Sequence, residues 1–303
     1  MLRHFVDLFD LSPEAARDLI WRALELKRAD QQGRRPPYLS GRTLGLIFEK
    51  PSLRTRVSFE AAIAQLGGNA IFLQGKDVGM GVRESIADFA RVISQYVDAL
   101  AVRTFSHLTV EELARHATIP IINALSDSAH PCQAMADLMT IHEAFGGLDG
   151  LKLVFVGDGN NVARSLAFAA GKLKMKLVVA SPRGYALDED TIRRANGFTP
   201  DCTTQVCDPY TAVTDADVIY TDTWVSMGQE NEKAKRQKDF AGYAVDAKLV
   251  AAAPKHVRIM HCLPAYRGYE ITDEVAESPG SIMFDQAENR LHFQRALLKK
   301  LMA

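Results

Sequence analysis

The feature that most constrains the fold is a regular alternation of short apolar segments with segments of helical periodicity. The expected strands are Thr43–Phe48, Ala70–Leu73, Ala99–Val102 and Pro120–Asn123, followed by Leu151–Val156, Leu177–Ser181, Cys202–Cys207, Val218–Thr221 and Arg258–His261. Repeated strand–helix–strand order is typical of parallel sheets covered by helices. The apolar run 153–156 fits a strand that is buried on both faces.

The alternation predicts an α/β protein with two domains, each a parallel sheet flanked by helices. A helical pattern over 131–145 ends at Gly146-Gly147, which favours a boundary there. We therefore expect a first domain over 1–135 and a second over 150–270. A C-terminal helix at about 285–303 is expected to return to the first domain. A length of 303 residues suits two domains of this size.

Charge and hydropathy exclude some partners. The formal net charge is -1, so there is no overall basic field that would favour nucleic acid. The basic run Lys233–Lys238 is expected to be a solvated helix or loop. No apolar run approaches the roughly 18 residues of a membrane span, and charge interrupts the N-terminus too early for a secretory signal. These patterns predict a cytoplasmic protein with no membrane partner.

The cysteines do not predict a metal site. The chain has four, Cys132, Cys202, Cys207 and Cys262, and we expect reduced thiols. Cys202 and Cys207 lack a second pair at the spacing of a zinc site, and His261 belongs to no zinc pattern. The expectation is therefore that no metal is bound.

The segment Ser52-Leu53-Arg54-Thr55-Arg56 follows a buried strand and the turn signal Lys50-Pro51, and it opens a helical pattern over 52–66. Unpaired N–H groups and the dipole at a helix start favour anions, and arginine offers a planar fork that matches phosphate. The alternative is a Ser N-cap beside two solvated arginines. The pattern favours the anion site.

Two further clusters follow strands of the first domain. His130-Pro131-Cys132-Gln133 comes after the strand at 120–123, with Pro131 at the first helical position. Arg103 follows the strand at 99–102 in the same way. The carboxyl ends of parallel strands form the usual ligand crevice, so these side chains are candidates for ligand binding. A structural His in an N-capping loop remains the alternative for His130.

Three clusters follow strands of the second domain. Gly157–Asn161 invites a dinucleotide-binding interpretation, but the third Gly and a later ribose acid are missing. Asp222–Glu230 offers a carboxylate for an ammonium group. In His261-Cys262, adjacent side chains on an extended segment point apart, so His261 is not expected to activate Cys262 as a nucleophile.

Taken together, these strings resemble the aspartate/ornithine carbamoyltransferase family from Leu44 to Arg290. Ser-x-Arg-Thr-Arg is similar to its carbamoyl phosphate signature, although Leu53 stands where members usually have Thr. The resemblance implies that Ser52, the Leu53 N–H, Arg54, Thr55, Arg103 and Arg290 bind carbamoyl phosphate. His130 would then form a hydrogen bond with the carbamoyl oxygen. The carbamoyl nitrogen would bond to Gln133 and to the carbonyls of Cys262 and Leu263.

The second half resembles the branch of the family that uses ornithine, through the Ser-Met-Gly loop and the His-Cys-Leu-Pro string. By this resemblance Asn161 binds the α-carboxylate of ornithine, with Asn160 as the competing assignment. Asp222, Ser226 and Met227 would complete the ornithine site, and Cys262 would lie beside the δ-amine. The implied catalytic residues are Arg54, Arg103, His130, Asp222 and Cys262.

The resemblance implies transfer of a carbamoyl group from carbamoyl phosphate to L-ornithine, giving citrulline for arginine biosynthesis, without a cofactor. It also implies a homotrimer or a multiple of trimers. The loop Lys76–Glu84 has Gly79 where many members carry Gln, which puts a contact to a neighbouring subunit in question. The alternatives are N-acetylornithine, N-succinylornithine or putrescine as acceptor, a nicotinamide-dependent dehydrogenase, and a non-catalytic regulator that binds carbamoyl phosphate.

Overall fold

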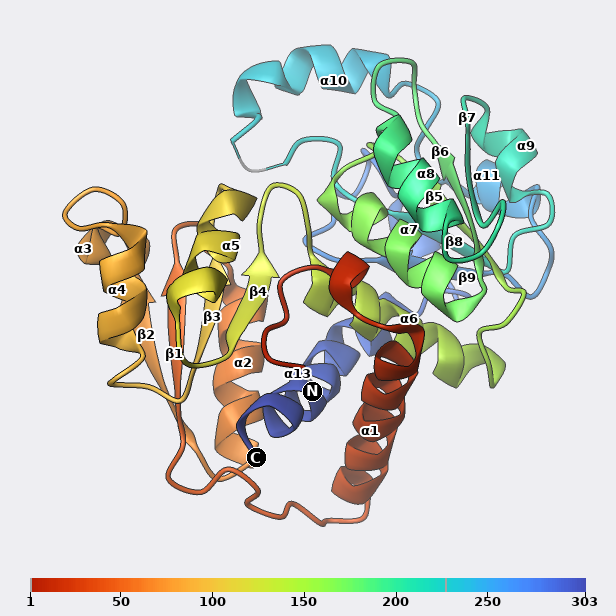
Figure 1. The fold of residues 1–303 in the computed structure, drawn as a ribbon. Helices are drawn as coiled ribbons and strands as arrows, with labels where there is room; N and C mark the ends of the chain where they lie inside the picture. Colours follow the sequence, from red (N-terminus) through yellow and green to blue (C-terminus); the bar gives the residue numbers. More distant parts are fainter. Residues whose placement is uncertain (1, 227) are drawn as a thin grey trace. The chain divides into compact units, whose positions relative to one another are not determined.

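The computed structural model describes residues 2–226 and 228–303 and separates them into two compact units (Figure 1). Unit 1 contains the chain up to Met139 together with Asn289–Ala303, and unit 2 contains Thr140–Glu288. The chain therefore leaves unit 1 once and returns to it through its last helix. Within the described residues, no helix combines the length and apolar character needed to cross a membrane.

Unit 1 is built on a parallel sheet with the strand order β2-β1-β3-β4. The strands are β1 (Thr43–Phe48), β2 (Asn69–Gln74), β3 (Ala99–Arg103) and β4 (Ile121–Leu125). The order reverses beside β1, because β2 lies on one side of it and β3 on the other. A reversal of this kind opens a crevice at the carboxyl ends of the strands. The segment after β1 carries the Ser52–Arg56 string, and Arg103 is the last residue of β3.

Helices cover this sheet (Figure 1). They are α1 (Pro13–Gln31), α2 (Leu53–Gln65), α3 (Gly75–Val78), α4 (Ile86–Ile93), α5 (His107–His116), the start of α6 (Pro131–Phe145) and most of α13 (Met283–Met302), with a 3-10 turn at Leu8–Asp10. The central strands β1 and β3 are almost wholly buried, as expected for a sheet with helices on both faces. One part of the core joins Ile47, Val102 and Ile121 to Phe89 of α4 and Leu113 of α5.

Unit 2 repeats the architecture with the strand order β7-β6-β5-β8-β9, again parallel. Its strands are β5 (Lys152–Val156), β6 (Lys176–Ala180), β7 (Thr203–Val206), β8 (Val218–Thr221) and β9 (Arg258–His261). Its helices are α7 (Asn161–Leu173), α8 (Glu189–Asn196), α9 (Pro209–Val213), α10 (Lys233–Asp239), α11 (Ala247–Ala251) and α12 (Asp273–Ala276), with a 3-10 turn at Glu230–Glu232. The order reverses between β5 and β8, which places Gly157–Asn161 and Asp222 at the switch point.

The structure confirms the predicted fold class. Both sheets are parallel and covered by helices, and the predicted strands agree with β1 to β9 within a few residues. The return of the C-terminal helix is also confirmed. From α13, Asn289 accepts a 2.8 Å hydrogen bond from Lys27 of α1, and Arg290 reaches α2 and α6. Helix α1 was not anticipated, although Ser12 caps it and Pro13 opens it.

Candidate active site

The Ser52–Arg56 string forms the predicted helix start in unit 1. Ser52 caps α2, since its Oγ accepts a 3.3 Å hydrogen bond from the Thr55 N–H and donates to Thr55 Oγ1 at 3.1 Å. Arg56 pairs with Glu60 and lies over the Phe72 ring. The side chains of Arg54 and Leu53 are exposed. Of the two arginines, Arg54 is therefore the one available to a ligand at this helix start.

Three sequence-distant motifs meet at Arg290. Its guanidinium donates to Gln133 Oε1 of α6 and, at 3.2 Å, to Thr55 Oγ1 of α2. Gln133 in turn donates to Asp137 Oδ1 at 2.7 Å. All four side chains are buried. A buried arginine needs polar partners, and this network supplies them while leaving further acceptor capacity on the Gln133 carbonyl.

His130 lies in the same environment. It precedes α6, and its backbone carbonyl accepts from the Gln133 N–H at 3.1 Å. Burial lowers the pKa of His130 well below its usual range, and the nearby positive charges of Arg290 and Arg103 lower it further. The imidazole is therefore neutral at neutral pH. A neutral ring has one N–H group, which can donate a hydrogen bond to a carbonyl oxygen.

The loop before His130 is fixed by a polar hub at Ser126. Its Oγ accepts from the Ala129 N–H at 3.2 Å and lies 2.7 Å from His107 Nδ1, and Asn123 Nδ2 donates to it at 3.2 Å. The Ser126–Ala129 turn closes with a 2.9 Å backbone hydrogen bond. These contacts tie the end of β4 to the start of α5, so the fold rather than the loop sequence alone sets the position of His130.

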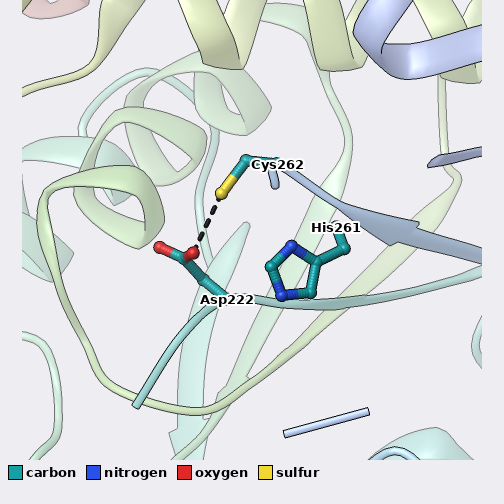
Figure 2. Close-up of side chains that lie close together, drawn as sticks. All are labelled: Asp222, His261 and Cys262. Atoms are coloured by element: carbon teal, nitrogen blue, oxygen red, sulfur yellow. Dashed lines mark hydrogen bonds between the residues drawn. The ribbon is translucent and has the colours of Figure 1, made fainter. Parts of the chain in front are cut away.

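In unit 2, Asp222 and Cys262 face each other after β8 and β9 (Figure 2). The Cys262 thiol donates to Asp222 Oδ1 at 3.0 Å, and the Thr223 N–H donates to the same oxygen at 2.8 Å. Asp222 is buried, with 8% of its surface exposed, and Cys262 is partly exposed. A carboxylate beside a partly exposed thiol is an arrangement that an amine can approach and bond.

His261 supports this segment and does not face the thiol as a base. Its Nε2 lies 3.1 Å from Glu270 Oε1, and its Nδ1 accepts a 2.8 Å hydrogen bond from the Leu263 N–H. Both ring nitrogens are therefore engaged in the buried interior. Leu263 has a φ of 59°, a conformation that side chains other than Gly rarely adopt. The prediction that His261 does not activate Cys262 is consistent with this geometry.

Asn160 and Asn161 open α7. Asn160 caps the helix, since its Oδ1 accepts from the N–H groups of Val162 at 2.9 Å and Ala163 at 3.2 Å. Its Nδ2 donates to Asp222 Oδ2 at 2.9 Å. Asn161, the first residue of the helix, is partly exposed. The amide of Asn160 is thus committed to internal partners, which favours Asn161 as the residue that meets a ligand.

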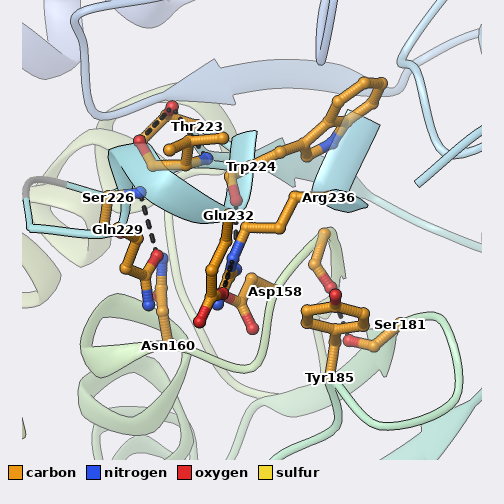
Figure 3. A network of polar contacts seen from close by, with 12 residues as sticks. Asp158, Asn160, Ser181, Tyr185, Thr223, Trp224, Ser226, Gln229, Glu232 and Arg236 are labelled. Atoms are coloured by element: carbon orange, nitrogen blue, oxygen red, sulfur yellow. Dashed lines mark hydrogen bonds and ion pairs between the residues drawn. The ribbon is translucent and has the colours of Figure 1, made fainter. Parts of the chain in front are cut away.

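The segment after Asp222 is tied down by Arg236 of α10 (Figure 3). Arg236 Nη1 donates to Asp158 Oδ2 at 2.6 Å and to the Trp224 carbonyl at 3.1 Å, and Nε donates to Glu232 at 2.8 Å. Burial raises the pKa of Asp158 in spite of this ion pair. Arg236 is 6% exposed, so the expectation of a fully solvated basic run is wrong at this residue.

Ser226 lies in this tethered segment, where its N–H donates to Gln229 Oε1 at 3.1 Å (Figure 3). Ser226 is partly exposed. Met227 lies outside the described residues, so its predicted role stays a prediction.

One group of side chains has the composition of a metal site. Ligand atoms of Asp222, His261 and Cys262 lie within 4.8 Å of one another, and this set of O, N and S donors is one that Zn²⁺ accepts. In the present arrangement the thiol donates to the carboxylate, and both ring nitrogens of His261 have protein partners. The three groups are therefore held by the protein's own contacts.

Sequence reasoning missed several side chains that shape these clusters, namely Asp137, Asp158, Arg236 and Glu270. Each is polar and buried or nearly so. Asp158 and Arg236 pair across 78 residues, whereas Asp137 and Glu270 lie outside the motif strings and contact the motif residues Gln133 and His261. A lone acidic or basic residue carries no local signal of burial. Asn160 did carry one, because an Asn before a helix is a typical N-cap.

Comparisons with known proteins identify the family of the chain. The family model described as "Aspartate/ornithine carbamoyltransferase, carbamoyl-P binding domain" matches residues 3–143. The model described as "Aspartate/ornithine carbamoyltransferase, Asp/Orn binding domain" matches residues 149–301. The chain therefore belongs to the aspartate/ornithine carbamoyltransferase family, a class of group-transfer enzymes. Membership in this family sets aside the dehydrogenase hypothesis.

The individual relatives described next are ornithine carbamoyltransferases. The chain is 50% identical over 303 residues to an ornithine carbamoyltransferase of Anoxybacillus flavithermus, covering 99% of this chain and 96% of that one. It is also 50% identical to an "Ornithine carbamoyltransferase, anabolic" of Pyrococcus furiosus, covering 98% and 96%. A solved structure of ornithine carbamoyltransferase from the same organism superposes with a TM-score of 0.96, at 49% identity and 99% and 97% coverage.

Proposed function

We propose that this chain transfers the carbamoyl group of carbamoyl phosphate to the δ-amine of L-ornithine, giving L-citrulline and phosphate. The observation that carries the proposal is the end-to-end likeness to ornithine carbamoyltransferases at about half identity. Since one of these relatives is named anabolic, the proposed role is arginine biosynthesis. The proposed location is the cytoplasm.

In unit 1, the proposed ligands of the phosphate are Ser52, the Leu53 N–H, Arg54, Thr55, Arg103 and Arg290. The α2 N-terminus and Arg54 lie where an anion is favoured. The network around Arg290 holds Thr55 and Gln133 before any ligand arrives, so little reorganisation is needed on binding. Neutral His130 and Arg103 would polarise the carbamoyl oxygen, and Gln133 would bind the carbamoyl nitrogen.

In unit 2, the proposed ornithine ligands are Asn161 and Ser226 for the amino acid head group, with Asp222 and Cys262 at the δ-amine. The Asp222–Cys262 contact places a carboxylate and a sulfur side by side at the switch point of the sheet. Met227 completes the predicted set. The carbonyls of Cys262 and Leu263 stay predicted partners of the carbamoyl nitrogen.

The reaction forms a bond from the δ-nitrogen to the carbamoyl carbon and breaks the bond from that carbon to the phosphate oxygen. An alkyl ammonium group like that of Lys has a pKa near 10.4, so freeing its lone pair at neutral pH costs roughly 4–5 kcal/mol. A carboxylate stabilises the ammonium form. Asp222 therefore serves to place the amine and to receive its proton, while the departing phosphate keeps the bonding electrons.

The chain is proposed to assemble as a homotrimer or a multiple of trimers. Leu53 and Val57 of α2 and Ile71 of the edge strand β2 are large apolar side chains that are 75%, 51% and 46% exposed. Exposed apolar side chains on an edge strand and its neighbouring helix are typical of surfaces that associate. Sedimentation of the purified protein tests this, and a monomer at micromolar concentration would contradict it.

The function is tested by citrulline formation from carbamoyl phosphate and L-ornithine, beside N-acetylornithine, N-succinylornithine, putrescine and aspartate. We expect strong preference for ornithine. Preference for another acceptor would keep the carbamoyl phosphate assignment and overturn the assignment of Asp222 and its loop. If carbamoyl transfer to every acceptor failed, the transferase proposal would be wrong.

A further inference from the structure

The side-chain amide of Asn160 both accepts and donates hydrogen bonds. Its carbonyl oxygen accepts from the N–H groups of Val162 and Ala163 at the start of α7. Its amide nitrogen donates to Asp222 Oδ2 at 2.9 Å. The reverse orientation would aim the NH₂ group at two helix donors and the carbonyl at a carboxylate, so the contacts fix which way the amide points.

The other oxygen of Asp222 is held as well. Oδ1 accepts from the Cys262 thiol at 3.0 Å (Figure 2). It also accepts from the Thr223 N–H at 2.8 Å. Both carboxylate oxygens therefore have donors, two at Oδ1 and one at Oδ2. Without Asn160, Oδ2 would lose this partner, and the carboxylate could turn about its side-chain bonds.

The three donors that surround Asp222 are neutral. An Arg or Lys at the position of Asn160 would pair with the carboxylate and compete with a cationic substrate. An amide donor fixes the orientation and leaves the negative charge in place. The Asp222 environment is thus suited to meeting a positively charged amine.

An ordinary cap does not require asparagine here. Ser or Asp caps helices α1, α2, α4, α8, α9 and α11 of this chain. Asn, Asp and Ser cap helices about equally well. An ionised Asp accepts hydrogen bonds but donates none, and Ser is shorter, so the contact with Asp222 calls for an amide.

We propose that Asn160 is a positioning residue that couples the start of α7 to Asp222 and holds the carboxylate in the orientation that receives the δ-amine of ornithine. The inference rests on the proposed function for the identity of the amine. It assigns the adjacent asparagines separate tasks, with Asn160 acting through Asp222 and Asn161 meeting the substrate.

The decisive variant is Asn160→Asp, which keeps the cap acceptor and replaces the donor with a second carboxylate. We expect the melting temperature to change little and kcat/KM for ornithine to fall about 10- to 100-fold, as for loss of a hydrogen bond to a charged group. KM for carbamoyl phosphate should stay within about twofold of the wild-type value, a change smaller than the loss of one hydrogen bond would cause. Two adjacent carboxylates bind a proton more tightly, so activity relative to the wild type should recover as the pH is lowered.

The matched control is Asp208→Asn at the cap of α9, which makes the reverse exchange at an exposed position. It should leave the kinetics unchanged. Wild-type kinetics in Asn160→Asp would overturn the inference. So would a loss that tracks the melting temperature and falls equally on both substrates, because that pattern belongs to a cap alone.

A second measurement does not depend on turnover. Iodoacetamide reacts with the thiolate of cysteine, and a carboxylate fixed beside the sulfur disfavours that anion. In Asn160→Ala the carboxylate loses its Oδ2 donor and becomes freer to turn away from the sulfur, so alkylation of Cys262, followed by peptide mass spectrometry, should become several-fold faster than in the wild type, as expected when a neighbouring charge moves away. An unchanged rate would overturn the positioning role even if ornithine were not the substrate.

Discussion

The two proposed substrate-binding clusters carry opposite charge: positive in unit 1 and negative in unit 2. In unit 1, the positive charges of Arg290 and Arg103 act on His130, and Arg290 is held by Thr55 and Gln133. In unit 2, a single carboxylate, Asp222, is held by neutral donors. An anion site gains from positive charges fixed in advance, whereas a site for an amine must keep its negative charge unpaired. The comparison indicates that charge placement, more than the shared sheet architecture, separates the two roles.

The largest expected effect is at Arg54. The variant Arg54→Ala should lower turnover about 10²- to 10³-fold with the fold intact, because a donor to the developing phosphate charge is lost. Steady-state kinetics beside circular dichroism measure this. The control Arg56→Ala removes a surface pair with Glu60 and should cost little. Equal losses in the two variants would break the distinction between ligand arginine and surface arginine.

A smaller effect is expected at Arg290. In Arg290→Lys a single ammonium replaces the planar fork, so it cannot hold Thr55 and Gln133 in the same way. We expect KM for carbamoyl phosphate to rise about tenfold, the loss associated with one hydrogen bond to a charged group. KM for ornithine serves as the internal reference. A rise confined to ornithine would contradict the assignment of this network to carbamoyl phosphate.

The tether in unit 2 should have a more modest influence. Arg236→Met leaves Asp158 and the Trp224 carbonyl without their donor, which should destabilise the fold by about 1–3 kcal/mol. KM for ornithine should rise several-fold because the segment with Ser226 loosens. Lys235→Met, at an exposed position of the same helix, is the control. Unchanged ornithine kinetics with lowered stability would limit the tether to a structural role.

The smallest effect concerns the pH dependence of stability. Burial raises the pKa of Asp158 above its ordinary value of 3.8. The folded state therefore binds this proton more tightly than the unfolded state. The resulting stability is present below pH 3.8 and is lost as the pH rises through the folded pKa. Relative to Asp158→Asn, the wild-type free energy of unfolding should fall with rising pH in that window, measured by urea titration. If the free energy of unfolding of the wild type relative to Asp158→Asn rose with pH instead, the prediction would be wrong.

The fold could be predicted from the sequence because its signals are local. Apolar runs such as Thr43–Phe48 and Val218–Thr221 became strands with the same bounds, since a strand buried on both faces must be apolar throughout. Helix starts at Ser52 and Pro131 followed from capping chemistry. Helix α1 carried the same signals at Ser12 and Pro13 and could have been found.

The residues of the candidate site also differ in whether a local sequence signal predicts them. Motif residues such as Arg54, His130, Asp222 and Cys262 stand out because each follows a strand, and in a parallel sheet those positions share one edge. Supporting residues outside the motifs did not stand out. Arg236 sits in a basic run typical of solvent, yet it is buried against Asp158, 78 residues away.

By itself the sequence determined the strand–helix alternation, the two sheets and the order of the motifs, because hydrophobic periodicity and helix caps act over a few residues. Only the tertiary structure decided that Arg290 joins Thr55 and Gln133 across 235 and 157 residues, and that Asn160 rather than a charged group holds Asp222. Such contacts depend on burial, where a polar atom without a partner is costly, and burial is a property of the whole packed unit.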